Sequence, residues 1–99
     1  MEILILGLSH KTAPVEIREK FSFSKEELKA SLIKIVSLPF VKEGLILSTC
    51  NRVEILTVTD NANMAILNLK NFLSELRGIP VSDIEPYLYT CLLYTSDAA

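Results

Sequence analysis

One short stretch of this chain contains side chains that are able to bind and attack a substrate. It is LSTCNRVEI (47–55), where apolar residues at both ends favour a sheet and polar residues with a thiol fill the middle. A cysteine reacts as its thiolate, which nearby positive charge favours. Arg52 lies two residues after Cys50, and its forked guanidinium also suits a carboxylate. This pattern is typical of a nucleophile beside a substrate clamp.

The same stretch has an inert interpretation. A single cysteine in a strand-like run is commonly a small buried apolar side chain. Arg52 would then form a surface ion pair with Glu54, and Asn51 would be a turn residue. Cys50 and Arg52 share a face only if the chain stays extended through Asn51, because residues two apart project to the same side of a strand. The residues leave both interpretations open.

His10 is the sole histidine, so it is the only imidazole in this chain that could act as a base for Cys50. It follows the first apolar run. In the fold expected below, that first strand is central, and its end could approach the Cys50 turn. A histidine at such a position is more commonly a hydrogen-bonded turn residue. The basic residues after it are expected to be solvated, with phosphate contact as the weaker alternative: Lys11, Arg18 and Lys20.

Length and composition limit the class of protein. Ninety-nine residues, 49% of them hydrophobic, suit one folded domain with a single core. The net charge of −2 provides no general field for nucleic acid. The start lacks a secretory pattern, and no apolar run approaches the roughly 20 residues that span a bilayer, so we expect a cytoplasmic protein. Cys50 and Cys91 indicate neither a disulfide nor a metal site.

The elements that must position these residues follow from hydrophobic periodicity and helix-end signals. A buried strand is expected in MEILILGLSH (1–10), and a short helix capped by Thr12 with Pro14 in its first turn. Ser24 and Glu27 match a capping box at the head of a longer helix that Pro39 ends.

The second half of the chain has the same kind of signals. EGLILSTCN (43–51) and RVEILTVTD (52–60) are expected to pair as a hairpin, or to form one bent strand. Asn61 or Asn63 caps the next helix, which Gly78 ends. DIEPYLYT (83–90) offers a last short strand after Pro86.

This order predicts an α+β fold, a ferredoxin-like split βαβ sandwich with an antiparallel sheet and helices on one face. Such a fold is found among enzymes, RNA binders and regulatory modules, so it does not decide the function.

Two motifs together resemble a known family. GLSHKTAPVEIREK (7–20) and LSTCNRVEI (47–55) are similar to the N-terminal catalytic domain of glutamyl-tRNA reductase, over Met1 to about Tyr89. The resemblance implies an oxidoreductase in which a cysteine attacks the aminoacyl ester of glutamyl-tRNA and holds a glutamyl thioester. NADPH then reduces the thioester to glutamate-1-semialdehyde, in the first step of tetrapyrrole (porphyrin) synthesis.

The resemblance also implies roles for individual residues. Cys50 is the expected nucleophile and Arg52 the clamp for the substrate's carboxylate. Thr49 and Asn51 are expected in the pocket. The first signature of the family, expected nearby, falls on Ser9, His10, Lys11 and Thr12.

The chain departs from the family in two ways. Full-length members continue into a Rossmann NADPH domain and a helical domain that forms a homodimer, and this chain has no GxGxxG, so full turnover is not expected. The expected domain is 1–90. CLLYTSDAA (91–99) is expected to be a disordered or foreign tail unrelated to the family.

Two other functions stay open. The first is a noncatalytic ferredoxin-like module that binds RNA or a small ligand, although the few aromatic residues and the acidic balance disfavour base stacking. The second is a thiol redox switch, which lacks a resolving cysteine near Cys50.

Overall fold

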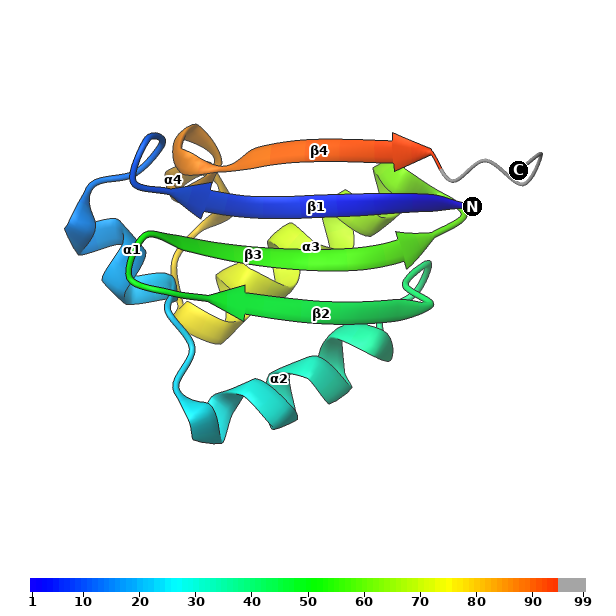
Figure 1. Cartoon of the computed structure of the whole chain (residues 1–99), viewed down its shortest axis with the longest axis horizontal. Coiled ribbons are helices and arrows are strands. Elements are labelled where there is room, and N and C mark those ends of the chain that lie inside the picture. Colours follow the sequence, from blue (N-terminus) through cyan, green and yellow to red (C-terminus); the bar gives the residue numbers. More distant parts are fainter. Residues whose placement is uncertain (95–99) are drawn as a thin grey trace.

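The computed structural model describes residues 1–94, which form a four-stranded antiparallel sheet with helices packed against one face (Figure 1). The strands are β1 (Glu2–Ser9), β2 (Glu43–Ser48), β3 (Arg52–Thr59) and β4 (Tyr89–Tyr94). The helices are α1 (Val15–Phe21), α2 (Lys25–Val36), α3 (Ala62–Arg77) and α4 (Val81–Ile84), followed by the 3-10 turn η1 (Glu85–Tyr87). The sheet order β2-β3-β1-β4 places β1 and β3 in the centre. The predicted α+β, ferredoxin-like class is confirmed.

The core lies between the sheet and the helices. Alternate residues of β1 and β3 are buried there, since side chains on a strand point to opposite faces in turn. These residues are Leu4, Leu6, Leu8, Val53, Ile55 and Thr57. Helix α3 passes behind the sheet in Figure 1 and adds a buried stripe of Ala65, Leu69, Phe72 and Leu73. The other face of the sheet is open, and Leu45 and Leu47 of β2 are exposed on it.

Three predicted helix signals are confirmed. Ser24 and Glu27 form the capping box of α2, with the Ser24 side chain accepting from the Glu27 N–H and the Glu27 carboxylate accepting from the Ser24 N–H. Asn61, rather than Asn63, caps α3 through a bond from the Met64 N–H. Gly78 ends α3 in the left-handed region, with φ of 66°.

The prediction for α1 was wrong at its start. Pro14 is the N-cap, and no side chain caps the helix. The Thr12 hydroxyl instead accepts a bond from the Ser9 N–H at 2.9 Å, which closes the turn after β1. Thr12 therefore shapes the end of a strand rather than the start of a helix.

The C-terminal region has more structure than the sequence indicated. Helix α4 and η1 precede β4, and neither was predicted. Cys91 to Tyr94 continue β4, with Cys91 opposite Ile5, so these four residues do not belong to a disordered tail. These residues form a strand because they pair with β1, an interaction that the local sequence does not indicate. Residues 95–99, the rest of the expected tail, lie outside the described residues.

Candidate active site at the thiol turn

The connection between β2 and β3 is a tight hairpin turn, residues 49–52, which we call the thiol turn. The Thr49 N–H donates to the Arg52 carbonyl at 2.8 Å. The Thr49 hydroxyl accepts from the N–H groups of Asn51 and Arg52, each at 3.2 Å. The chain therefore bends at Cys50 and Asn51, and the hairpin alternative is confirmed. Cys50 and Arg52 do not meet the extended-strand condition for sharing a face.

Cys50 is exposed at this bend. Its side chain is therefore outside the core, and the interpretation of Cys50 as a buried apolar residue is wrong. Cys91 is exposed as well, on the open face of the sheet. Exposure makes both thiols accessible, so any difference in their reactivity must come from their surroundings.

The end of β1 lies directly beside the thiol turn, as predicted. The His10 N–H donates to the Asn51 carbonyl at 2.8 Å, and Ser9 pairs with Arg52 in the strand register. In Figure 1, the β2–β3 turn and the end of β1 lie at the same end of the sheet as α1. The structure thus brings together the two predicted groups of site residues. His10 is exposed, and its role as a base stays a prediction.

Arg52 and its neighbours form a polar chain on the open face of the sheet. Arg52 Nη1 lies 3.8 Å from Glu54 Oε1, which is the surface pair of the inert interpretation. The Tyr89 hydroxyl donates to Glu54 Oε2. Burial of the phenol and its hydrogen bond to Glu54 raise the pKa of Tyr89 to about 12. Sequence reasoning did not connect Tyr89 to this site, because the contact depends on the register of β4.

Gly7 makes room for this contact. It lies on β1 between the two partners, opposite Glu54 on β3 and Tyr89 on β4. A Cβ atom at Gly7 would come within 2.6 Å of the Val53 carbonyl oxygen and 2.8 Å of the Glu54 Cγ. Only a residue without a side chain leaves the space that Glu54 needs to reach Tyr89.

A second guanidinium reaches the thiol turn from α1. Arg18 Nη1 donates to the Cys50 carbonyl oxygen at 2.7 Å. Arg18 and the turn border a cavity of about 320 Å³, whose lining residues are Val15, Arg18, Glu19, Ser22, Phe23, Ser48, Thr49 and Cys50. We call this cavity the α1 groove. The sequence placed Arg18 in a solvated basic cluster, and its spacing of 32 residues from Cys50 carried no local signal.

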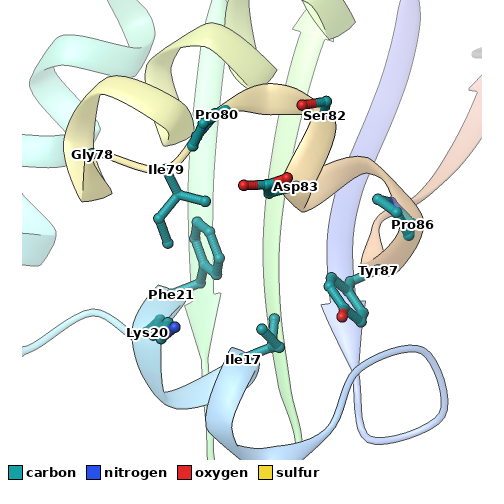
Figure 2. Close-up of a pocket in the computed structure, with 10 residues that line it drawn as sticks. All are labelled: Ile17, Lys20, Phe21, Gly78, Ile79, Pro80, Ser82, Asp83, Pro86 and Tyr87. Atoms are coloured by element: carbon teal, nitrogen blue, oxygen red, sulfur yellow. The ribbon is translucent and has the colours of Figure 1, made fainter.

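A larger cavity, of about 550 Å³, lies between α1 and α4. Figure 2 shows Lys20 on one wall and Asp83 on the other, with Phe21 and Ile79 between them. None of the predicted site residues lines it. The α1 groove is smaller, but Cys50 is one of its lining residues, so we place the candidate site there.

Residues 1–94 contain no cluster of three His, Cys, Asp or Glu side chains suited to a metal. The three glycines lie apart, at Gly7, Gly44 and Gly78, and form no phosphate-binding loop. Across the same residues, every helix is too short or too polar to span a bilayer.

Comparison with known proteins connects this geometry to a family. The family model described as "Glutamyl-tRNAGlu reductase, N-terminal domain" matches residues 6–98. The chain is 46% identical over 99 residues to the glutamyl-tRNA reductase of Geotalea daltonii, covering all of this chain and 22% of that protein. It is 44% identical over 92 residues to the glutamyl-tRNA reductase of Synechocystis sp., covering 93% of this chain and 22% of that protein. The chain therefore spans about a fifth of the length of these curated relatives.

Proposed function

Because this chain belongs to the glutamyl-tRNA reductase family, whose N-terminal domain it matches, we propose that its thiol turn accepts the glutamyl group of glutamyl-tRNA on Cys50. This is the thioester-forming half of the oxidoreductase reaction that begins tetrapyrrole synthesis. The observation that carries the proposal is an exposed thiol on a hydrogen-bonded turn, with Arg18 bonded to the Cys50 carbonyl and Arg52 at the end of the turn.

The chemistry balances within the substrate and the thiol. The Cys50 sulfur forms a bond to the ester carbonyl carbon, and the bond from that carbon to the ribose oxygen breaks. The thiol proton ends on the ribose hydroxyl of the released tRNA. The attacking group is the thiolate, and two guanidinium groups, those of Arg18 and Arg52, lie at the turn that carries it.

Arg52 is the proposed clamp for the glutamyl side-chain carboxylate. Its pairing with Glu54 is long, at 3.8 Å, and the Arg52 side chain is 52% exposed. The Glu54 side chain is only 14% exposed, but it keeps its hydrogen bond from Tyr89 when the guanidinium exchanges this long contact for a substrate carboxylate. Thr49 and Asn51 belong to the turn, Ser9 and His10 lie beside it, and all four are proposed to contact the substrate.

NADPH, when bound, would supply a hydride to the thioester. The residues of this chain do not fit that cofactor, because its three glycines serve strand packing and a helix end. We therefore derive no reduction step from this chain and assign NADPH binding to the part of the family protein beyond it.

Three further assignments rest on the family. They are a cytoplasmic location, a homodimer of the full-length protein and a domain that extends past the expected boundary at residue 90, because the family model matches residues 6–98 and β4 (Tyr89–Tyr94) crosses that boundary.

The proposal is tested by following labelled glutamate from glutamyl-tRNA to the protein. We expect the 99-residue chain to gain label that survives denaturation and is removed by hydroxylamine, as a thioester would be. Cys50→Ser should lose this label. Cys91→Ser, which removes the other exposed thiol, should retain it.

A binding module would give a different result. Label that associates with the folded chain but leaves on denaturation, equally in Cys50→Ser and the unchanged protein, would contradict a covalent role and favour noncatalytic binding.

A further inference from the structure

Arg18 differs from the other two arginines in how its charge is compensated. Arg77 bonds the Glu27 carboxylate at 2.8 Å and the Ser22 carbonyl at 2.6 Å, and it lies over the Phe23 ring. Arg52 has Glu54 as its partner. Within residues 1–94, Arg18 makes no ion pair, and its one hydrogen-bond acceptor is the neutral Cys50 carbonyl.

The position of Arg18 also includes an unfavourable feature. Its Nε atom is buried and has no hydrogen-bond partner among the described residues. A buried donor without a partner is unfavourable, so it needs a compensating gain elsewhere. Arg77 Nε shares this feature, but the rest of its guanidinium is paired with a carboxylate. An unpaired guanidinium beside a thiol is an arrangement that a bound anion would complete.

The α1 groove has room and donors for such an anion. Its volume of about 320 Å³ lies within the range of small-ligand sites. The Ser48 hydroxyl accepts a bond from the Phe23 N–H at 3.0 Å, which leaves its own hydrogen free to donate. Glu19 is the one acidic residue that lines the groove, and it opposes an anion there.

Arg18 and Arg52 approach the thiol turn from opposite faces of the sheet. Arg52 shares the open face with Glu54, opposite to the buried Val53. Arg18 comes from α1, which packs on the helix-covered face. The thiol turn therefore has one cationic group on each side, and a substrate with two anionic groups can contact both.

We infer that the α1 groove is an oxyanion subsite, in which Arg18 and the Ser48 hydroxyl bind a carboxylate or phosphate group of the molecule that Cys50 attacks. If the proposed function holds, Arg52 already binds the glutamyl carboxylate, and the group in the α1 groove is then a phosphate near the end of the tRNA. This assignment rests on the proposed function. The subsite itself does not depend on that assignment.

The test compares alkylation of Cys50 by iodoacetate, an anion, and by iodoacetamide, its neutral analogue, in the 99-residue chain. Both reagents attack the same thiolate. We therefore compare the rate with iodoacetate divided by the rate with iodoacetamide, because this ratio does not depend on how much of the thiol is ionised or how accessible it is. Peptide mass spectrometry resolves Cys50 from Cys91, which serves as a control in the same molecule. We expect the ratio at Cys50 to exceed the ratio at Cys91 and to fall as salt is added.

Variants separate the charge of Arg18 from its structural role. Arg18→Gln should lower the Cys50 ratio roughly threefold, as the loss of one unit charge several ångströms away in a hydrated groove implies. Arg18→Lys should keep most of the ratio, because it retains the charge. Glu19→Gln should raise it. An unchanged ratio in Arg18→Gln, or an equal fall in Arg18→Lys, would overturn the subsite, and the Glu19 variant tests it even if Arg18→Gln unfolds.

Protection experiments distinguish the two sources of the oxyanion. Adenosine monophosphate and glutamate are each added while Cys50 reacts with iodoacetamide. Protection by the nucleotide that is weaker in Arg18→Gln would place a phosphate in the groove, whereas glutamate protection lost in that variant would place a carboxylate there. If Arg18→Gln changes neither the protection by the nucleotide nor the protection by glutamate, the subsite is refuted. No step uses glutamyl-tRNA, so a failure here is distinct from a failure to acylate Cys50.

Discussion

At the scale of single residues, the environment of Cys50 depends on groups that are far apart in sequence. The motif places Arg52 and Thr49 near the thiol, and the structure shows Thr49 holding the turn with its hydroxyl. Arg18 comes from α1, and its role was not predictable because no periodic pattern links a helix residue to a turn 32 positions later.

The two cysteines should therefore differ in reactivity although both are exposed. Cys50 lies beside Arg18, whereas Cys91 lies opposite Ile5 on the sheet. We expect a neutral alkylating reagent to modify Cys50 several times faster than Cys91 in folded protein at neutral pH, because the proposed acyl transfer requires Cys50 to be the more reactive of the two thiols. Peptide-resolved mass spectrometry measures both rates. Equal rates, or faster modification of Cys91, would count against an activated thiol.

Gly7 provides a second test at this scale. Gly7→Ala should destabilise the protein by about 2 kcal/mol, because the added methyl group meets the Val53 carbonyl in a closely packed sheet. Urea unfolding followed by circular dichroism measures the loss. Gly44→Ala is the matched control: its Cβ would meet side-chain atoms only, the nearest at 3.2 Å, so its cost should be smaller. A Gly7 variant as stable as the Gly44 variant would show that Gly7 is not needed for strand packing.

At the scale of elements, one ion pair ties α3 to the start of α2. Arg77 at the end of α3 bonds Glu27 in the first turn of α2 and the Ser22 carbonyl before it. The hydrogen bonds from Arg77 and from the Ser24 N–H lower the pKa of Glu27 from its ordinary 4.5 to about 2. This connection fixes the segment between α1 and α2. That segment includes Phe23, which lies under Arg77 and lines the α1 groove.

The lowered pKa of Glu27 predicts how stability depends on pH. A carboxyl group with a lower pKa in the folded state stabilises the protein above its unfolded pKa, and that contribution is lost as pH falls from about 4.5 to about 2. Glu27→Gln should flatten this part of the curve of unfolding free energy against pH while keeping the capping box, which accepts Gln as well.

Urea unfolding at several acidic pH values measures that slope. Glu26→Gln, on the same helical turn but without a described ion pair, should leave it unchanged. If the slope of the Glu27 variant equals that of the unchanged protein, the pair with Arg77 does not shift this carboxyl.

At the scale of the whole molecule, the sequence predicted the order and type of the main elements. The capping box at Ser24, the Asn61 cap and Gly78 are local signals, and each was confirmed. The sequence did not predict α4, η1 or the extension of β4 through Cys91, because these depend on packing against α3 and pairing with β1. For the site, the thiol and its neighbours were predictable, whereas Arg18 and Tyr89 required the tertiary fold.

The proposed function of this domain is acyl transfer to one thiol. The most direct measurement incubates the 99-residue chain with glutamyl-tRNA and compares the released tRNA with the glutamyl group found on each cysteine by peptide mass spectrometry. We predict one glutamyl group on Cys50 for each tRNA released, and none on Cys91. A chain that leaves glutamyl-tRNA intact, or that releases tRNA while Cys50 stays unmodified, would contradict the account.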